Sequence, residues 1–251
     1  MNEKLDTARV FERVFAIYRD QFTLLIPAAL MVFLPVAILS GVVYAATPGP
    51  LELLVILVVG AIAGVYFQGM VVEAARDILD GRRDHTVGSL FRSVTPVVVP
   101  LAIAGILAGI ATGIGFLLLI VPGLILLTIW AVIAPVIVIE RTGAIDAFGR
   151  SRELVRGNGW QVFGVIVVVY LLQFVSSLVL QALANSISDS VTAYAVSELI
   201  VRLLVAPLSA LAAAVLYFEL AARPGEQPAA PQAVPPPPTT GTQGGGPGPS
   251  G

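Results

Sequence analysis

Long uncharged stretches alternate along the chain with short segments that carry nearly all of its charges. A helix that crosses a bilayer needs about 20 mostly apolar residues to cover roughly 30 Å of hydrocarbon. Six stretches satisfy this requirement, although the fourth is short. The pattern therefore predicts an all-α, polytopic membrane protein whose six transmembrane helices occupy residues 22–46, 51–72, 97–120, 124–139, 161–183 and 199–218.

Three breaks rich in turn-forming residues join these spans in pairs. They lie at residues 47–50, which contain two prolines and a glycine, at residues 121–123, with the sequence Val-Pro-Gly, and at the mostly polar residues 185–190. Proline and glycine stop helices and accept the backbone angles of tight turns. We therefore expect the spans to form three helical hairpins.

The positive charges indicate how the hairpins are oriented. Every Lys and Arg except Arg202 lies before the first span, between the second and third, between the fourth and fifth, or after the sixth. The positive-inside rule then places both termini and both long loops in the cytoplasm. A cleaved signal peptide is the alternative for the first stretch, but the acid-containing segment before it and the length of its apolar run argue against one.

A short amphipathic segment precedes each odd-numbered span. Its apolar residues share one helical face, and its charged residues lie elsewhere on the helix. Such helices lie in the headgroup layer of a membrane, so we predict three units of cytoplasmic interfacial helix, span, turn and span. The alternative is an ordinary set of amphipathic loops without a repeated architecture. The predicted faces are Phe11, Val14, Phe15, Tyr18 and Phe22; Val87, Leu90, Phe91 and Val94, after a Thr86 cap; and Ala144, Ala147, Phe148, Ser151 and Val155.

Glycines recur at intervals of four residues in two of the spans. Gly60 and Gly64 lie in the second span, and Gly105, Gly109 and Gly113 lie in the third. Such faces let helices approach each other closely within lipid. We expect these faces to pack inside the bundle, with a homodimer seam as the alternative.

From residue 224 to residue 251 the composition changes to Pro, Gly, Ala, Thr and Gln. A segment of this kind does not bury enough apolar surface to fold. We therefore divide the chain into a transmembrane domain, residues 1–223, and a disordered cytoplasmic tail, residues 224–251. The alternative role for the tail is a polyproline II ligand that binds a partner protein.

One pair of charges falls within or beside the sixth span. Glu198 and Arg202 are four residues apart, so they lie on one helix face with the spacing of an ion pair. Charges at membrane depth are costly, which makes this intramembrane pair the leading candidate for a functional site. Either the pair anchors the helix near the outer membrane surface, or Arg202 faces a cavity and binds an anion such as a lipid phosphate.

The other polar residues near the spans suggest structural roles. Glu73 with Arg76, and Glu140 with Arg141, lie where spans end, and we interpret both sets as solvated helix ends with internal ion pairs. Four amides are expected to form hydrogen bonds between helices, with a polar substrate path as the alternative. These amides are Gln68, Gln173, Gln181 and Asn185.

Composition argues against several functional classes. Only 12% of the residues are charged, against about a quarter in soluble domains, and a net charge of −2 argues against a nucleic-acid partner. The chain has no cysteine, and its one histidine, His85, has no further ligands at metal-site spacing. Because phosphate-binding loops and nucleophile motifs are also missing, we predict no enzyme, no cofactor and no metal site.

Residues 121–164 carry a recognisable series of motifs. The series is Val121-Pro122-Gly123, Trp130, Pro135, Glu140, Gly143-Ala144, Ala147-Phe148, Arg150-Ser151, Leu154-Val155-Arg156-Gly157, Trp160 and Gly164. Together with residues 215–220, it resembles the membrane domain of some bacterial glycerophosphoryl diester phosphodiesterases, a family that also has stand-alone six-span members. That family usually has Asp and Arg where this chain has Glu219 and Ala221. The resemblance implies a six-span fold and no activity, because catalysis in that family belongs to a separate metal-binding barrel domain, for which this sequence has neither the length nor the residues.

Three functional hypotheses follow. The first is a non-catalytic membrane scaffold or assembly factor that binds a protein partner or a second copy of itself. The second is a transporter or lipid-handling protein that binds an anionic lipid or solute near Arg202, and the third, which follows from the resemblance alone, is a membrane-embedded lipid phosphodiesterase. We expect the protein to lie in the bacterial plasma membrane, because the excess of arginine over lysine suggests a GC-rich bacterial genome. As a membrane protein, it has membrane lipids as expected partners.

Overall fold

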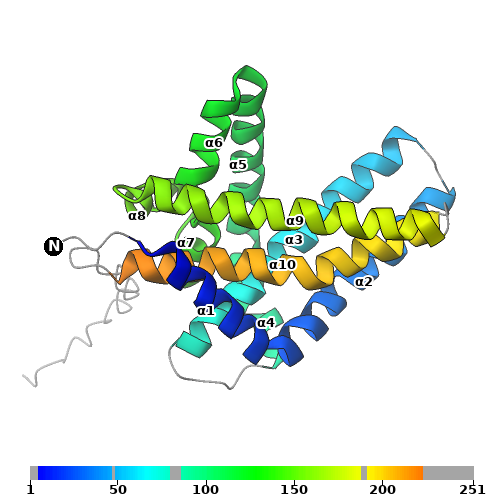
Figure 1. Ribbon diagram of the computed structural model, residues 1–251, viewed down its shortest axis with the longest axis horizontal. Coiled ribbons are helices and arrows are strands. Elements are labelled where there is room, and N and C mark those ends of the chain that lie inside the picture. The colour runs from blue at the N-terminus through cyan, green and yellow to red at the C-terminus, as the bar shows by residue number, and fades with distance from the viewer. Residues whose placement is uncertain (1–4, 47–48, 80–85, 188–190, 223–251) are drawn as a thin grey trace, which may run out of the picture.

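The computed structural model describes residues 5–46, 49–79, 86–187 and 191–222, and within them it contains helices and no strands (Figure 1). Six helical segments are long and apolar enough to cross a membrane, which confirms the predicted all-α polytopic fold. The predicted tail lies outside the described residues. In chain order the helices are α1 (Thr7–Asp20), α2 (Phe22–Ala46), α3 (Pro50–Leu79), α4 (Val87–Val94), the 3-10 helix η1 (Thr95–Val97), α5 (Val98–Leu118), α6 (Ile120–Ile129), α7 (Ile133–Glu140), α8 (Ala144–Val155), α9 (Gly159–Ile187) and α10 (Val191–Ala221).

The spans form hairpins that share one end of the molecule and diverge toward the other (Figure 1). We call the shared end, where α1, α4 and α8 lie, the base, and the opposite ends of the hairpins the tips. From the base, α2–α3 and α9–α10 extend together, whereas the α5–α6 hairpin extends in a different direction (Figure 1). Helix α10 is the central element, because it contacts α1, α2, α3, α7, α8 and α9.

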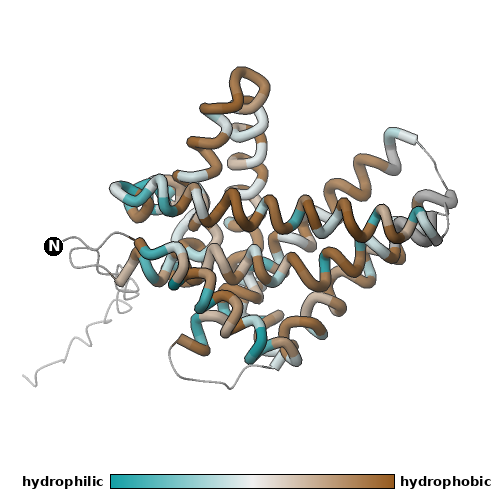
Figure 2. The backbone as a smooth tube through the Cα atoms, in the orientation of Figure 1, coloured by the Kyte–Doolittle hydropathy of each residue, from teal (hydrophilic) through white to brown (hydrophobic). Residues whose placement is uncertain are grey.

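Apolar side chains are buried near the base and exposed toward the tips. On α7, Val136 and Ile137 are fully buried, whereas Leu117 at the α5–α6 tip is 86% exposed. Figure 2 shows that hydrophobic residues dominate the spans, while hydrophilic residues are most frequent around α1 and α8. A lipid environment covers exposed apolar surface of this kind, as it does for other spanning helices.

The first amphipathic helix, α1, forms as expected but packs with a partly different face. It buries Val10, Val14 and Ile17, whereas Phe15 is 53% exposed and Phe22, which opens α2, is 43% exposed. The predicted face is therefore confirmed at Val14, and at Phe11 and Tyr18, which pack partly buried against the core, but it is wrong at Phe15 and Phe22. Helix α1 makes its contacts chiefly with α10 and α9.

The second and third amphipathic helices pack with the predicted faces, except that Phe91 on α4 is 38% exposed. Helix α4 begins with a capping box, in which the Thr86 hydroxyl accepts from the backbone N–H of Ser89 at 3.3 Å and the Ser89 hydroxyl accepts from that of Thr86 at 2.9 Å. Leu90 and Val94 are then buried against the spans. The residues that α8 buries are Ala147, Ser151, Leu154 and Val155.

The fourth span consists of two helices, α6 and α7. The chain leaves the helical path between Ile129 and Ile133 because Pro135 has no N–H to donate to the carbonyl four residues earlier, and its ring clashes with that carbonyl. The hydroxyl of Ser151, on α8, donates to the carbonyl oxygen of Ile129 at 2.9 Å. One carbonyl that the break frees therefore keeps a hydrogen bond away from water.

The turn between α5 and α6 does not lie at residues 121–123, so that prediction is wrong. The chain reverses at Leu119, which is extended (φ −163°, ψ 148°), and Pro122 lies in the first turn of α6, where a missing N–H costs no helical bond. Gly123 instead allows close packing, because a Cβ on it would lie 2.6 Å from the ring of Phe116 on α5. The third predicted turn covers residues 185–190. Helix α9 continues through its first part to Ile187, and residues 188–190 lie outside the described residues. Residues 47–48, in the first predicted turn, also lie outside them.

Candidate functional site

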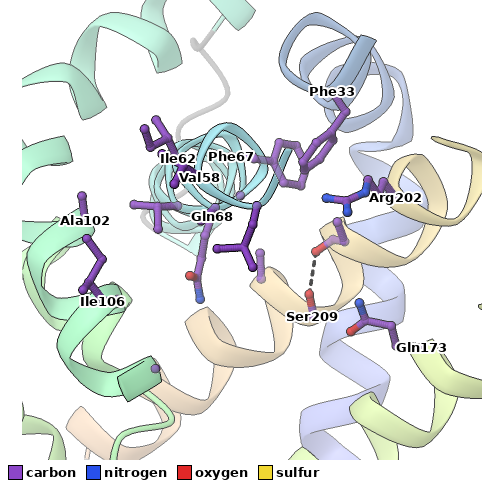
Figure 3. A pocket seen from close by; sticks show the side chains of 18 of the residues that line it. Phe33, Val58, Ile62, Phe67, Gln68, Ala102, Ile106, Gln173, Arg202 and Ser209 are labelled. Atoms are coloured by element: carbon purple, nitrogen blue, oxygen red, sulfur yellow. Dashed lines mark hydrogen bonds between the residues drawn. The ribbon is translucent and has the colours of Figure 1, made fainter. Parts of the chain in front are cut away.

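A cavity of about 860 Å³ lies where the α5–α6 hairpin diverges from the other spans. Its lining comes from α2, α3, α5, α9 and α10, and most of its surface is apolar (Figure 3). Val58 and Ile62 on α3 lie opposite Ala102 and Ile106 on α5 (Figure 3). Sites for small molecules typically enclose about 300–1,000 Å³, so this cavity is large enough to hold one.

Glycines enlarge this cavity instead of bringing helices together. Gly64, Gly105 and Gly109 line it, and a Cβ on Gly64 or Gly109 would meet no atom within 4 Å. Gly60 and Gly113 likewise have open space beside them, and only at Gly105 would a Cβ touch another helix, at 3.4 Å from Val65. The prediction that these glycine faces pack inside the bundle is therefore wrong at four of the five positions. The spaces beside Gly64 and Gly109 are part of the cavity.

Glu198 and Arg202 are the charged residues in the described lining of the cavity. The Nε of Arg202 donates to the Oε1 of Glu198 at 3.0 Å, and both side chains are partly exposed, by 43% for Arg202 and 32% for Glu198. The guanidinium carbon lies 5.8 Å from the centre of the Phe33 ring, a cation–π contact between α10 and α2. The structure thus brings the predicted pair together and places it in a cavity wall.

The pair leaves hydrogen-bonding groups available to a ligand. Within the described part of the chain, neither terminal nitrogen of Arg202 has a hydrogen-bond partner, since the bond to Glu198 uses Nε. Arg202 lies eleven residues from the start of α10, or about 16 Å from the tip at 1.5 Å per residue. A polar group at this depth in a membrane gains from any partner that enters the cavity.

Three neutral polar side chains continue the polar surface from the pair toward the base. They are Gln68 on α3, Gln173 on α9 and Ser209 on α10, and all three line the cavity (Figure 3). The Ser209 hydroxyl donates to the carbonyl oxygen of Ala206 at 2.9 Å, drawn as the dashed line in Figure 3. The same three side chains also line a second cavity of about 230 Å³ between α6, α9 and α10. They therefore lie at the boundary between the two cavities.

A separate polar cluster at the base was missed by the sequence analysis. The side chain of Glu140 is only 2% exposed, and its carboxylate accepts from the Nε of Arg150 at 3.1 Å and from the Tyr217 hydroxyl at 2.9 Å. Our interpretation of Glu140 as a solvated helix end is therefore wrong. The error arose because α8 and α10, distant in sequence, fold over the end of α7 and bring their own polar groups to it.

Glu73 is also buried, contrary to its interpretation as part of a solvated helix end. Its side chain is 6% exposed and pairs with Arg141, and with Arg76 at 3.9 Å. Arg141 ends α7 with a positive φ of 55°, which is uncommon for a residue with a side chain, and also donates to the carbonyl oxygen of Ser93 at 3.0 Å. These contacts tie α3, α4 and α7 together at the base, which is a structural role.

The remaining candidates that the structure describes lie apart from the cavity. Within the described ranges, no group of three or more His, Cys, Asp or Glu residues is placed to hold a metal ion. His85 lies outside the described residues. Gln181 and Asn185 lie toward the tip end of α9, apart from the cavity lining.

Comparisons with known proteins leave the family open. No protein-family model, no curated protein and no solved structure matches this chain. The resemblance to the membrane domain of bacterial glycerophosphoryl diester phosphodiesterases therefore stays a prediction.

Proposed function

We propose that the protein is a lipid-handling membrane protein whose cavity binds a phospholipid. In this proposal, the acyl chains lie along the apolar surfaces of α3 and α5, and the phosphate lies against Arg202. The observation that carries the proposal is the position of the Glu198–Arg202 pair in the wall of an otherwise mostly apolar cavity. That combination matches the two parts of an amphipathic molecule.

A lipid suits this cavity better than a small polar solute. The described polar lining consists of two charged and a few neutral side chains, and the remaining surface would gain nothing from contact with a fully hydrated ion. Acyl chains, in contrast, replace water or loosely packed lipid along Val58, Ile62 and Ile106. Gln68, Gln173 and Ser209 then offer hydrogen bonds to a headgroup on its way toward the base.

The location and orientation form part of the same proposal. We place the protein in the plasma membrane of a bacterium, with both termini in the cytoplasm. The support is that α1, α4 and α8 lie together at the base and carry arginines that the positive-inside rule assigns to the cytoplasmic face. Arg202 then lies in the outer half of the membrane.

The other hypotheses from the sequence stay predictions. The contacts among the described residues do not favour the scaffold hypothesis. They also do not test whether the protein binds a protein partner or forms a homo-oligomer. The same holds for the expectation that the protein has no enzymatic activity. A lipid in the cavity is compatible with either.

Filling the cavity tests the proposed function. Gly109→Leu adds a side chain at a residue that lines the cavity, and its Cβ meets no atom within 4 Å, so the first added carbon causes no clash. The full chain in detergent is incubated with equal amounts of dioleoyl phosphatidylethanolamine and dioleoyl phosphatidylglycerol, and bound lipid is counted by native mass spectrometry. We expect Gly109→Leu to lower total bound lipid about tenfold, which corresponds to about 1.4 kcal/mol of binding free energy.

The matched control is Gly113→Leu, one turn further along α5. Gly113 also has open space beside it but does not line the cavity, so this variant should bind as much lipid as the unchanged protein. Equal lipid binding by the Gly109 variant and the unchanged protein would contradict the proposal. So would an equal loss in both variants, because it would mean that the cavity is not the site.

A further inference from the structure

We infer that the cavity selects a zwitterionic headgroup with a phosphate and a primary ammonium, the phosphoethanolamine class, in which the phosphate lies on Arg202 and the ammonium on Glu198. The inference rests on the proposed function, because it names the ligand of the same cavity. Glu198 and Arg202 are the charged members of the described lining, so the site carries no net charge.

A neutral pair of opposite charges discriminates between headgroups. An anionic headgroup that binds Arg202 also comes close to the carboxylate of Glu198, which is four residues away on the same helix face and 3.0 Å from Nε. The repulsion is large in a region with little water, because Coulomb energies rise as the effective dielectric constant falls. A zwitterionic headgroup avoids this repulsion, because its phosphate lies beside Arg202 and its ammonium lies beside Glu198.

The free groups of the pair match the hydrogen-bonding pattern of this headgroup. A guanidinium binds phosphate through two parallel N–H donors, and Arg202 keeps its terminal nitrogens available because Glu198 uses Nε. Glu198 bonds through Oε1, and within the described residues its only hydrogen-bond donor is Arg202. A primary ammonium has three N–H donors for this carboxylate, whereas a quaternary ammonium has none.

Phe33 helps to hold the guanidinium in the required position. Its ring lies 5.8 Å from the guanidinium carbon and packs against the ring of Phe67 on α3, with 5.1 Å between the ring centres. Figure 3 shows Phe33, Phe67 and Arg202 side by side at one end of the cavity. With one N–H bonded to Glu198 and a ring close by, less conformational freedom is lost when a phosphate binds.

The experiment compares three lipids with identical dioleoyl chains on the full chain in detergent. Phosphatidylethanolamine, phosphatidylglycerol and phosphatidylcholine are titrated separately, and dissociation constants are measured by native mass spectrometry. We expect phosphatidylethanolamine to bind about tenfold more tightly than each of the other two. Glu198→Gln should abolish the preference over phosphatidylglycerol, because it removes the ammonium partner and the repulsion together.

Two further variants test the phosphate contact of Arg202 and provide a control outside the cavity. Arg202→Lys keeps the charge but loses the two-pronged phosphate contact, so it should weaken all three lipids about tenfold. Glu153→Gln on α8 is the control, since Glu153 is 69% exposed and lies outside the cavity, and it should change nothing. Equal affinity of the unchanged protein for the three lipids, with binding still sensitive to Gly109→Leu, would overturn the headgroup inference alone. Binding insensitive to Gly109→Leu would overturn the proposed function as well.

Discussion

Buried ionisable residues at the base show how single side chains hold the spans together. Glu140 is enclosed by α8 and α10, and two groups from different helices satisfy its carboxylate, namely Arg150 and Tyr217. A buried carboxylate without such partners would be strongly unfavourable. The pair in the cavity differs in this respect, because Glu198 and Arg202 remain partly exposed and can exchange part of their pairing for a ligand.

The Tyr217 hydroxyl should contribute measurably to stability. Tyr217→Phe removes a donor to a carboxylate whose side chain is 2% exposed, so we expect the free energy of unfolding to fall by about 1–3 kcal/mol. Reversible unfolding in mixed detergent micelles, followed by circular dichroism, measures this change. Tyr170→Phe is the control, because Tyr170 is 55% exposed, and it should change stability by less than about 0.5 kcal/mol. Equal effects of the two variants would contradict the role assigned to Tyr217.

At the scale of the helices, the sequence predicted what depends on local composition. The bounds of α2 and the number of spans followed from the lengths of the apolar stretches. The Thr86 cap followed from the capping preference of threonine. The turn at Leu119 did not, because it depends on how α6 packs against α5. The break before Ile133 has a local cause in Pro135, but the Ser151 hydroxyl that bonds the freed carbonyl comes from α8. For the same reason the sequence indicated that Glu198 and Arg202 pair, but not that Phe33 and Gln68 share a cavity with them.

The capping box of α4 is a locally encoded feature that can be tested on its own. Thr86→Ala removes the hydroxyl that accepts the Ser89 N–H at the start of an eight-residue helix, which costs about 1 kcal/mol. Amide hydrogen exchange across α4 should therefore become about fivefold faster. Thr86→Ser keeps the hydroxyl and should exchange like the unchanged protein. Unchanged exchange in the alanine variant would show that packing of Leu90 and Val94 alone fixes the helix.

At the scale of the whole molecule, the divergence of the hairpins creates the cavity. The base is closed by buried residues of α1, α7, α8 and α10, whereas the α5–α6 hairpin extends away from the other spans (Figure 1). Near the α5–α6 tip, Gly115 lies close to Gly123 within the hairpin, and Leu117, Leu118 and Leu119 are exposed. In the proposed function, a lipid enters the cavity from the membrane at this side.

The central claim, a phospholipid beside Arg202, is tested most directly by electron cryo-microscopy of the full chain. The protein would be reconstituted in nanodiscs of dioleoyl phosphatidylethanolamine, with a bound antibody fragment to add mass. We predict density for a phosphate in contact with the Arg202 guanidinium, continuous with acyl-chain density between Ile62 on α3 and Ile106 on α5. A map in which α5 packs directly on α3, or in which the cavity holds no lipid density, would contradict the account.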